Sequence, residues 1–426
     1  MVTGSTSAPG PVRARLHIYN RGPFAPFGSP KFRLFSAAML VSSTAVAIQT
    51  LARIWIVQDT THSPLLVAAV SAATGLPILV LGFFGGYLAD RFSRKWISVV
   101  GEVLSFAVAA GLAALAMLEI IHVWHIMLAS GLQGITTALV VSARQTLITD
   151  LVPENQQRGA IGLSMLVANV SGIIGPGAAG LLIPNFGTDI ALVVGAVVAL
   201  VGIVLFMWLK ISYTPVPEQK GHRMWADVVE GVRYVIRMPT LRWLMLCATI
   251  MLVMISSRGA VFPPLVQDVL GRGAAALGMM EMVGGVGAVL GPLFAVWLTG
   301  KYREIRIEIV TAILFSLSVA LLAISPWFAL TLFLSGAATF LGTIFFAANL
   351  SAIQLGAPAN LRGRVISVRF VLSGTHPMGI MALGALAQLT GPREALFAFA
   401  VAGIVLVLIL NVVLPAKDNP EPATAA

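Results

Sequence analysis

Five ionisable side chains lie inside long apolar stretches of this sequence, where their chemistry would be charge pairing and proton transfer. They are Arg53, Glu102, Arg258, Glu281 and His376. A charged group in hydrocarbon costs a few kcal/mol or more, so such a residue usually faces a partner or a water-filled cavity. These five residues are therefore candidates for ion coupling or for the lining of a cavity.

The residues alone leave two interpretations open for each candidate. Arg258 and Glu281 fall in the outer halves of neighbouring stretches, where they either pair across an outer gate or extend separately toward the membrane surface. Glu102 lies about 9 Å into its stretch, at 1.5 Å per residue, and either has a function or stays hydrated. His376 precedes Pro377, which should break the apolar stretch 363–389 beyond its middle. Its imidazole, with an ordinary pKa of about 6.5, suits either a proton-linked step or hydrogen-bonded packing.

Three neutral residues place hydrogen-bonding groups near the middle of apolar stretches rich in Met, Phe and Trp. They are Gln133, Asn169 and Ser373. A mostly apolar lining with a few polar groups is typical of pockets for organic ligands. This pattern favours a bulky amphipathic solute over a sugar.

A short charged segment, residues 85–97, separates two of the apolar stretches. It contains Asp90, Arg91, Arg94 and Lys95. A carboxylate in such a hairpin can accept hydrogen bonds from the amides that open a neighbouring helix, where the helix dipole also favours an anion. The alternative is that the basic residues only hold the hairpin on one side of a membrane.

The elements that must position these residues are membrane-spanning helices. Of 426 residues, 58% are hydrophobic and 10% are charged, with a mean hydropathy of +0.92, whereas soluble domains carry about 25% charged residues. The single Cys247 excludes an intramolecular disulfide and a cysteine-ligated metal. The sequence contains no glycine-rich phosphate loop with Lys-Ser/Thr and no cluster at metal spacing, so we expect neither an enzyme nor a cofactor or metal site.

Twelve apolar runs are long enough to cross about 30 Å of hydrocarbon as helices. Both termini should therefore lie on one side of the membrane. All but four of the 27 Lys and Arg residues fall in the two tails and the odd-numbered junctions, and positive charge resists translocation, so these segments should face the cytoplasm. The net charge of +10 then reflects membrane topology rather than nucleic-acid binding. The runs are residues 32–57, 64–88, 96–118, 123–143, 159–183, 188–209, 241–262, 275–298, 307–325, 327–350, 363–389 and 393–414.

The two halves of the chain repeat. Arg158, Gly175 and Gly180 recur 204 residues later as Arg362, Gly379 and Gly384. We predict an all-α membrane protein with twelve transmembrane helices in two pseudo-symmetric six-helix bundles and a solute site between them. The expected parts are a disordered basic cytoplasmic tail (1–31), the N-terminal bundle (32–209), a cytoplasmic linker with an amphipathic helix (210–240), the C-terminal bundle (241–414) and a C-terminal tail (415–426).

The charged hairpin resembles the loop between helices 2 and 3 of the major facilitator superfamily of secondary transporters, with the pattern G-x-L-a-D-r-x-G-r-k. Ser93 stands where that family usually has Gly. The resemblance implies the major facilitator fold and a latch from Asp90 to the start of span 11 in the outward-facing state. The cytoplasmic gate that it implies consists of Gly86, Asp90, Arg91, Arg94, Lys95, Arg362 and Gly363.

A second motif, in span 5, resembles the antiporter motif of drug exporters, G-x8-G-x3-G-P-x2-G-G. The matching positions are Gly162, Ser171, Gly175, Pro176 and Gly180. Small side chains let helices approach closely, and a proline permits a bend. The resemblance implies export, and the alternative is close helix packing of the kind found in any transporter.

Several stretches, among them residues 143–153 and 360–365, resemble a branch of bacterial exporters related to enterobactin and macrolide efflux proteins. This resemblance covers residues 32–414 and implies export of a small lipophilic or siderophore-like compound across the cytoplasmic (plasma) membrane by alternating access. It also implies proton coupling, although span 4 has Ser130 where the family pattern R-x-x-q-G has its arginine. The alternatives are an uptake permease or lysophospholipid flippase of the same fold, and a non-transporting membrane sensor. The expected partners are a small solute, protons and membrane lipid.

Overall fold

The described part of the chain is built from helices. The computed structural model describes residues 22, 24–91, 93–210, 224–358 and 361–413, without the side chains of residues 82–91, 149, 224–228, 370 and 373. Three short turns, η1 (Ala25–Gly28), η2 (Glu154–Gln156) and η3 (Leu265–Val269), accompany the main helices. The main helices are α2 (Pro30–Thr61), α3 (Pro64–Arg91), α4 (Arg94–Met117), α5 (Val123–Leu151), α6 (Gln157–Phe186), α7 (Thr188–Trp208), α8 (Met224–Arg237), α9 (Pro239–Pro264), α10 (Ala274–Thr299), α11 (Glu304–Ile324), α12 (Phe328–Gly356), α13 (Arg362–Ser373), α14 (His376–Thr390) and α15 (Pro392–Val413).

The helices give twelve membrane crossings, as the sequence predicted. Eleven helices of the described chain are long and apolar enough to span a bilayer. The twelfth crossing is made by α13 and α14 together, which are interrupted at Gly374 and Thr375. Pro377 follows this interruption and has no N–H to continue the helical ladder. The protein is therefore an integral, multi-pass membrane protein with a broken eleventh span.

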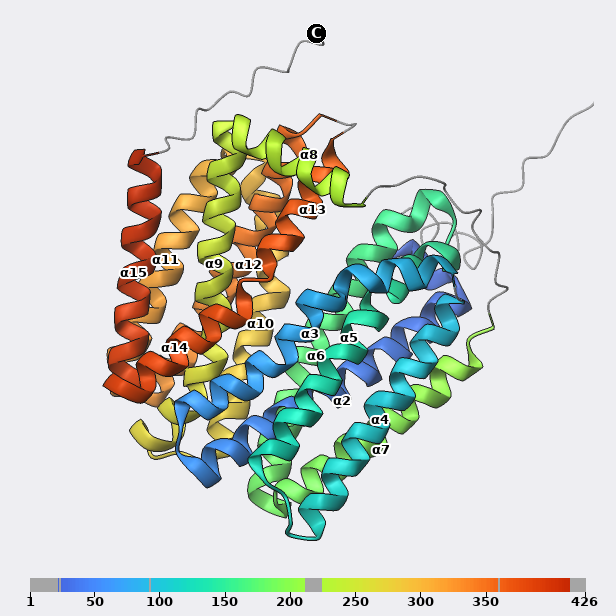
Figure 1. The fold of residues 1–426 in the computed structure, drawn as a ribbon, viewed down its shortest axis with the longest axis vertical. Coiled ribbons are helices and arrows are strands. Elements are labelled where there is room, and N and C mark those ends of the chain that lie inside the picture. The colour runs from blue at the N-terminus through green and yellow to red at the C-terminus, as the bar shows by residue number, and fades with distance from the viewer. Residues whose placement is uncertain (1–21, 23, 92, 211–223, 359–360, 414–426) are drawn as a thin grey trace, which may run out of the picture.

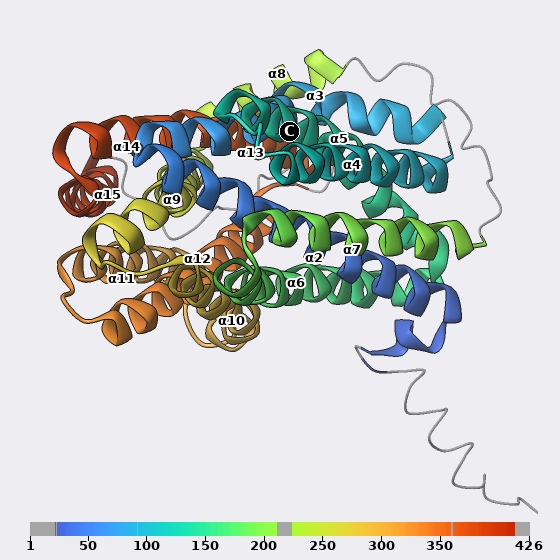
Figure 2. The ribbon, with the colours of Figure 1, turned by 90° about the horizontal axis from the view of Figure 1, so that it is seen from below.

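The crossings form two bundles of six. Helices α2 to α7 pack with one another in the first bundle, and α9 to α15 in the second, as Figure 1 shows. The bundles meet along two edges, where α3 packs on α14 and α6 packs on α10 (Figure 2). The predicted repeat is visible in helix lengths, because α5 and α12 both have 29 residues and begin 205 residues apart.

One end of the molecule, which we call the linker side, carries α8, the start of α2 and the end of α15 (Figure 1). The opposite end is called the far side. Helix α8 lies across the linker side and packs on α13, where Glu230 forms an ion pair with Arg364. A methyl group at Gly231 would approach Arg364 O to 2.5 Å, so the glycine permits this close packing.

The chain is ordered from before the predicted start of the first bundle. Ser29 caps α2 by accepting a hydrogen bond from the Phe32 N–H, and its hydroxyl donates to Leu151 O at 3.2 Å. The preceding turn, η1, has buried residues of its own. Residues 1–21 and 23 of the predicted tail, residues 211–223 of the linker and residues 414–426 lie outside the described part.

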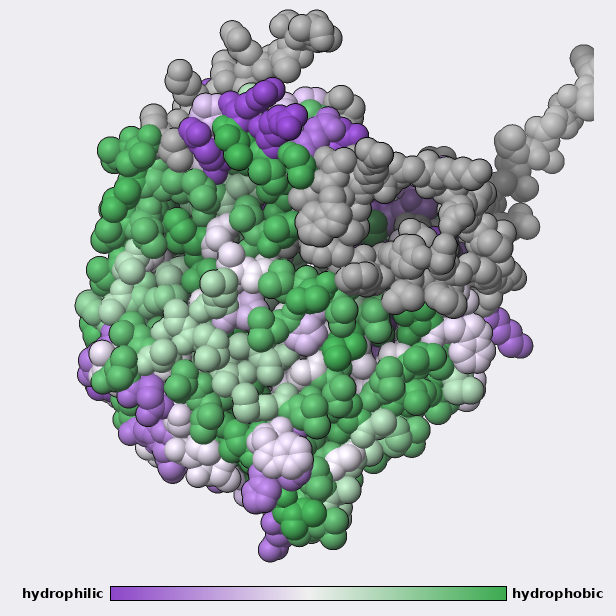
Figure 3. All heavy atoms as spheres, in the orientation of Figure 1, coloured by the Kyte–Doolittle hydropathy of each residue, from purple (hydrophilic) through white to green (hydrophobic). Residues whose placement is uncertain are grey.

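The outer surface carries the apolar side chains that a bilayer requires. Large hydrophobic residues such as Val80, Leu181, Val296 and Leu389 are more than half exposed. Figure 3 shows hydrophobic residues over the middle of the molecule and hydrophilic ones near α8 and at the opposite end. Lipid tails replace water around this band, so its exposure carries no aggregation penalty in the membrane.

Candidate functional site

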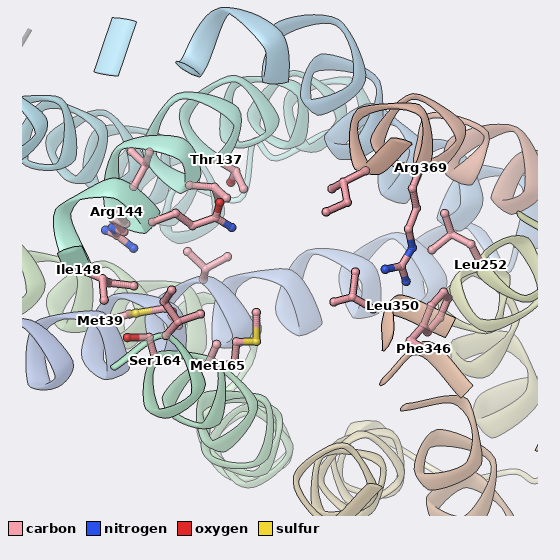
Figure 4. A pocket seen from close by; sticks show the side chains of 18 of the residues that line it. Met39, Thr137, Arg144, Ile148, Ser164, Met165, Leu252, Phe346, Leu350 and Arg369 are labelled. Carbon is pink, nitrogen blue, oxygen red and sulfur yellow. The ribbon is translucent and has the colours of Figure 1, made fainter. Parts of the chain in front are cut away.

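The candidate site is a cavity of about 890 Å³ between the two bundles. Its lining comes from the linker-side halves of helices in both bundles, and Figure 1 shows the bundles diverging toward that side. Most lining side chains are apolar. Figure 4 shows Arg144 and Arg369 reaching toward the cavity from opposite bundles. The labelled lining residues are Met39, Thr137, Arg144, Ile148, Ser164, Met165, Leu252, Phe346, Leu350 and Arg369.

The wall from the first bundle contains a buried ion pair and a polar cluster. Glu102 on α4 pairs with Arg144 on α5, and the Arg144 guanidinium lies 4.6 Å from the centre of the Phe206 ring. Gln133 donates to Ser105 Oγ at 3.3 Å and to Thr136 Oγ1 at 3.2 Å. Both Glu102 and Gln133, which the sequence singled out, therefore line the cavity with partners from their own bundle.

The wall from the second bundle has one charged side chain, that of Arg369, among the described lining residues. Its guanidinium lies 5.6 Å from the centre of the Phe346 ring. Behind this wall, Glu308 on α11 is fully buried and accepts a hydrogen bond from Asn349 Nδ2 at 3.0 Å. This wall is thus mostly apolar, with Thr249, Gln354 and Arg369 as its polar members and a carboxyl group in the layer behind it.

Close helix packing seals the cavity toward the far side, and the predicted antiporter motif makes this packing. A methyl group at Gly175 would lie 3.1 Å from Thr44 O of α2. At Gly180 it would lie 3.0 Å from the Cα of Gly278 on α10, so helices of the two bundles nearly touch there. Pro176 contributes its carbonyl to the same contact.

The other two motif positions do not take part in this contact. Ser171 is buried and donates to Ala168 O at 2.6 Å within α6. Gly162 has open space where a side chain would lie.

Four hydrogen bonds at the far side also join the bundles. Asp268 Oδ2 accepts from Gln58 Nε2 at 2.8 Å, and Asp268 Oδ1 lies 2.8 Å from His62 Nδ1. Gln267 Nε2 donates to Asp59 Oδ1 at 2.7 Å. The fourth bond runs from Ser63 Oγ to Gln388 Oε1 at 2.7 Å. With this end closed, the cavity is reached from the linker side.

The predicted gate residues whose side chains are described bind within their own bundle in this state. Arg94 Nη1 donates to both carboxylate oxygens of Asp150, to Oδ1 at 2.9 Å and to Oδ2 at 2.7 Å, and so links α4 to the end of α5. Lys95 Nζ donates to Met207 O at 3.0 Å. Arg362 Nε donates to Ala357 O at 3.1 Å, and Gly363 has open space where a side chain would lie. The side chains of Asp90 and Arg91 and the surroundings of Gly86 lie outside the described part.

The two buried arginines of the first spans occupy matching places in the two bundles. Arg258 lies 205 residues after Arg53. Arg53 donates to Gln49 O at 3.1 Å and to Ser130 Oγ at 3.4 Å. Arg258 donates to Ile255 O and Thr339 Oγ1, both at 3.2 Å.

Glu281 lies close enough to Arg258 for their charges to interact. The bonds that bridge the bundles at the far side come instead from Asp268 and its neighbours. The expected pairing of Arg258 with Glu281 across an outer gate stays a prediction.

The remaining predicted residues lie at the edges where the bundles meet. Asn169 Nδ2 on α6 donates to Ala288 O on α10 at 3.2 Å. His376 and Pro377 pack against Gly75 of α3, where a methyl group would lie 2.9 Å from Pro377 Cγ. His376 therefore sits at the inter-bundle contact beside the break in span 11. The side chain of Ser373 is outside the described part.

The family follows from comparison over nearly the whole chain. The model of the family described as transmembrane secretion effector matches residues 21–425. The chain belongs to this family. Among the curated relatives of this chain, the multidrug efflux pump Tap of Mycolicibacterium fortuitum is 27% identical over 396 residues, which cover 89% of this chain and 94% of Tap. The enterobactin exporter EntS of Salmonella typhi is 25% identical over 404 residues, covering 93% and 96%.

Several solved structures share the fold of this chain. The nucleoside transporter NupG aligns with a TM-score of 0.77 at 11% identity, covering 90% of this chain and 99% of NupG. A bacterial homologue of the human lysosomal transporter Spinster, in an inward-facing and occupied conformation, aligns with a TM-score of 0.71 at 13% identity, covering 90% and 96%. These identities show the fold alone, which is that of the major facilitator superfamily, as the hairpin motif predicted.

Three residues in or behind the cavity wall were not predicted from the sequence: Arg144, Arg369 and Glu308. Arg144 and Arg369 stand near the linker-side ends of their spans, where basic residues are common for topological reasons. Glu308 follows Glu304 and Arg306 and looked like part of a polar junction. The signal that could have found it is its spacing, since Glu308 lies 206 residues after Glu102 in a chain that repeats at about this interval.

Proposed function

We propose that this protein exports a small lipophilic or siderophore-like compound across the cytoplasmic membrane by alternating access, with protons as the driving ion. The observation that carries this proposal is the cavity shared by both bundles, reached from the linker side and sealed on the far side by helix packing and hydrogen bonds. Two bundles that rock about such a cavity expose it first to one side and then to the other.

The direction of transport rests on charge and on relatives. The linker side holds most of the basic residues and therefore faces the cytoplasm. The state described is then inward-facing, ready to take solute from inside the cell. Relatives named as a multidrug efflux pump and an enterobactin exporter support movement outward.

The chemistry of the cavity favours a particular class of solute. Just over half of its lining side chains are apolar, Met39, Met165 and Phe346 among them, and serine, threonine and glutamine side chains supply most of the remaining ones. The described lining holds one acid, Glu102, which is paired with Arg144, and a second guanidinium group, that of Arg369, reaches in from the other bundle. Neutral or acidic amphipathic compounds fit this balance better than cations.

Inside-out membrane vesicles test the proposal directly, because export then appears as accumulation in the lumen. Radiolabelled enterobactin, erythromycin and ethidium serve as probes, with and without a protonophore. We expect accumulation of enterobactin that the protonophore abolishes, and less accumulation of erythromycin and ethidium, which are both cations at neutral pH. Probe movement in the opposite sense would indicate uptake, and movement of lysophospholipid alone would indicate a flippase.

A matched pair of variants links the flux to the cavity. Ser43→Trp fills space in the lining, whereas Leu181→Trp places the same side chain on the lipid-facing surface. We expect Ser43→Trp to abolish accumulation and Leu181→Trp to leave it unchanged at equal membrane yield. Equal activity of both variants would refute the assignment of the cavity.

A further inference from the structure

A carboxyl group with an incomplete set of hydrogen bonds is buried in the second bundle. Glu308 has 0% of its surface exposed. Its Oε2 accepts a hydrogen bond from Asn349 Nδ2 at 3.0 Å, and the same amide nitrogen also donates to Leu244 O at 3.0 Å. Within the described chain, Glu308 Oε1 and Asn349 Oδ1 are both buried without a hydrogen-bond partner.

These two orphan atoms belong to side chains that already touch, and both are acceptors while Glu308 is ionised. Buried polar atoms in folded proteins nearly always find a partner, so two orphans in one contact require an explanation. A proton on Glu308 would turn one of its oxygens into a donor, and an acid and an amide can then bond to each other twice. Protonation of Glu308 would therefore give both unpartnered oxygens a hydrogen bond.

In the first half of the chain, the residue that corresponds to Glu308 is Glu102, and its carboxylate is paired with an arginine. Glu102 and Glu308 are 206 residues apart, and Arg144 and Asn349 are 205 apart, on helix pairs that correspond in the repeat. Glu102 is paired with the guanidinium of Arg144. In the second half, Asn349 stands at the position of Arg144. Glu308 therefore faces a neutral amide at this position, where Glu102 faces a positive charge.

Few ionisable groups act on Glu308, and one of them reaches the cavity. The groups are Arg369 of α13, Glu304 of α11 and the thiol of Cys247 on α9. Arg369 lines the cavity and belongs to the linker-side half of the interrupted span. Burial in an apolar bundle disfavours a charged carboxylate, whereas a nearby arginine favours it. A displacement of α13 that carried Arg369 away from Glu308 would shift this balance toward the protonated acid.

We propose that Glu308 is the site that binds and releases the proton in each transport cycle. Asn349 orients its carboxyl group by a hydrogen bond, and the charge of Arg369 acts on it from α13. This inference rests on the proposed proton-driven function and assigns the proton to a residue of the second bundle. Arg369 is the positioning residue that links the site to the cavity. Glu102, with its fixed partner, then has a structural role and exchanges no proton.

Infrared difference spectroscopy during a pH titration tests proton binding without any solute. The C=O stretching band of protonated carboxyl groups is recorded for the full chain in lipid nanodiscs. We expect Glu308→Gln to remove a titrating component of this band, and Glu304→Gln, one helical turn earlier, to retain it. A titrating band that is identical in the wild type and in Glu308→Gln would overturn the proposal.

Transport measurements separate coupling from solute movement, with enterobactin and erythromycin as probes in proteoliposomes. Glu308→Gln should lose accumulation driven by a proton gradient and keep the exchange of labelled for unlabelled probe across the membrane. Asn349→Arg rebuilds the ion pair of the first half and should give the same split with the carboxyl group still present. Gradient-driven accumulation that survives both changes would overturn the proposal.

The two proposals can fail separately. If the wild type accumulates neither probe under a proton gradient, the proposed function fails, and the infrared titration still decides whether Glu308 binds a proton. If the wild type accumulates a probe and the variants do so equally, the proposed function stands and the proton site is elsewhere.

Discussion

Removing the carboxylate of Asp268 should open the far-side seal. The Gln58 side chain that donates to Asp268 is buried, so a hydrogen bond to this charged acceptor is worth about 1.5 kcal/mol. The His62 side chain is 59% exposed, and its contact with Asp268 is worth about 0.5 kcal/mol because water screens it. Asp268→Ala therefore costs the far-side-closed state about 2 kcal/mol, an approximately 30-fold change in the ratio of the two states.

Distances between spin labels report this ratio. Glu154 on the first bundle and Leu355 on the second are exposed near the linker side and suit the labels. In the wild type we expect mostly the long distance of the linker-side-open state. In Asp268→Ala the population with a short linker-side distance should rise by about 30-fold relative to the long one.

Two further variants decide whether the reasoning holds. Asp268→Asn keeps an acceptor oxygen for Gln58 and should give a smaller shift than Asp268→Ala. Asp189→Ala removes an acid at the far-side start of α7, within the first bundle, and should give no shift. Identical distance distributions in the wild type and Asp268→Ala, or an equal shift in Asp189→Ala, would refute the assignment of Asp268 to the seal.

Three other substitutions test the packing, the gate and the ion pair. Gly278→Val should slow probe transport by about tenfold, because the valine side chain would collide with the Pro176 carbonyl of α6. Gly259→Ala adds a methyl group in open space and should leave transport unchanged. Asp90→Asn should lower export in inside-out vesicles at unchanged membrane yield, and unchanged export would remove the latch. Glu102→Gln leaves a buried guanidinium without its partner and should destabilise the fold by about 3 kcal/mol, seen as a lower thermal midpoint. Adding Arg144→Gln should recover most of that loss, and no recovery would count against the pair.

The sequence was sufficient for the architecture because membrane helices are defined by their composition. Long apolar runs and basic junctions placed the twelve crossings, and the repeat of residues such as Gly175 and Gly180 placed the two halves. Pro377 marked the eleventh span as irregular, and the structure shows it broken at Gly374. These features depend on local chemistry, which a linear chain displays.

The site was less accessible to sequence because it depends on which helices face one another. Glu308 stands at the polar start of a span, and its complete burial arises from α9 and α12 packing over it. The far-side bonds of Asp268 join residues about 200 positions apart. The choice between an inward-facing and an outward-facing state leaves no trace in the sequence, since the same residues serve both.

The matching positions of Glu102 and Glu308 show how one exchanged residue distinguishes two similar bundles. Glu102 is paired with an arginine on the next helix, whereas Glu308 accepts a hydrogen bond from an asparagine at the corresponding place. The same pair of helices can therefore hold either a fixed ion pair or a carboxyl group beside a neutral amide, without any change in how the helices pack.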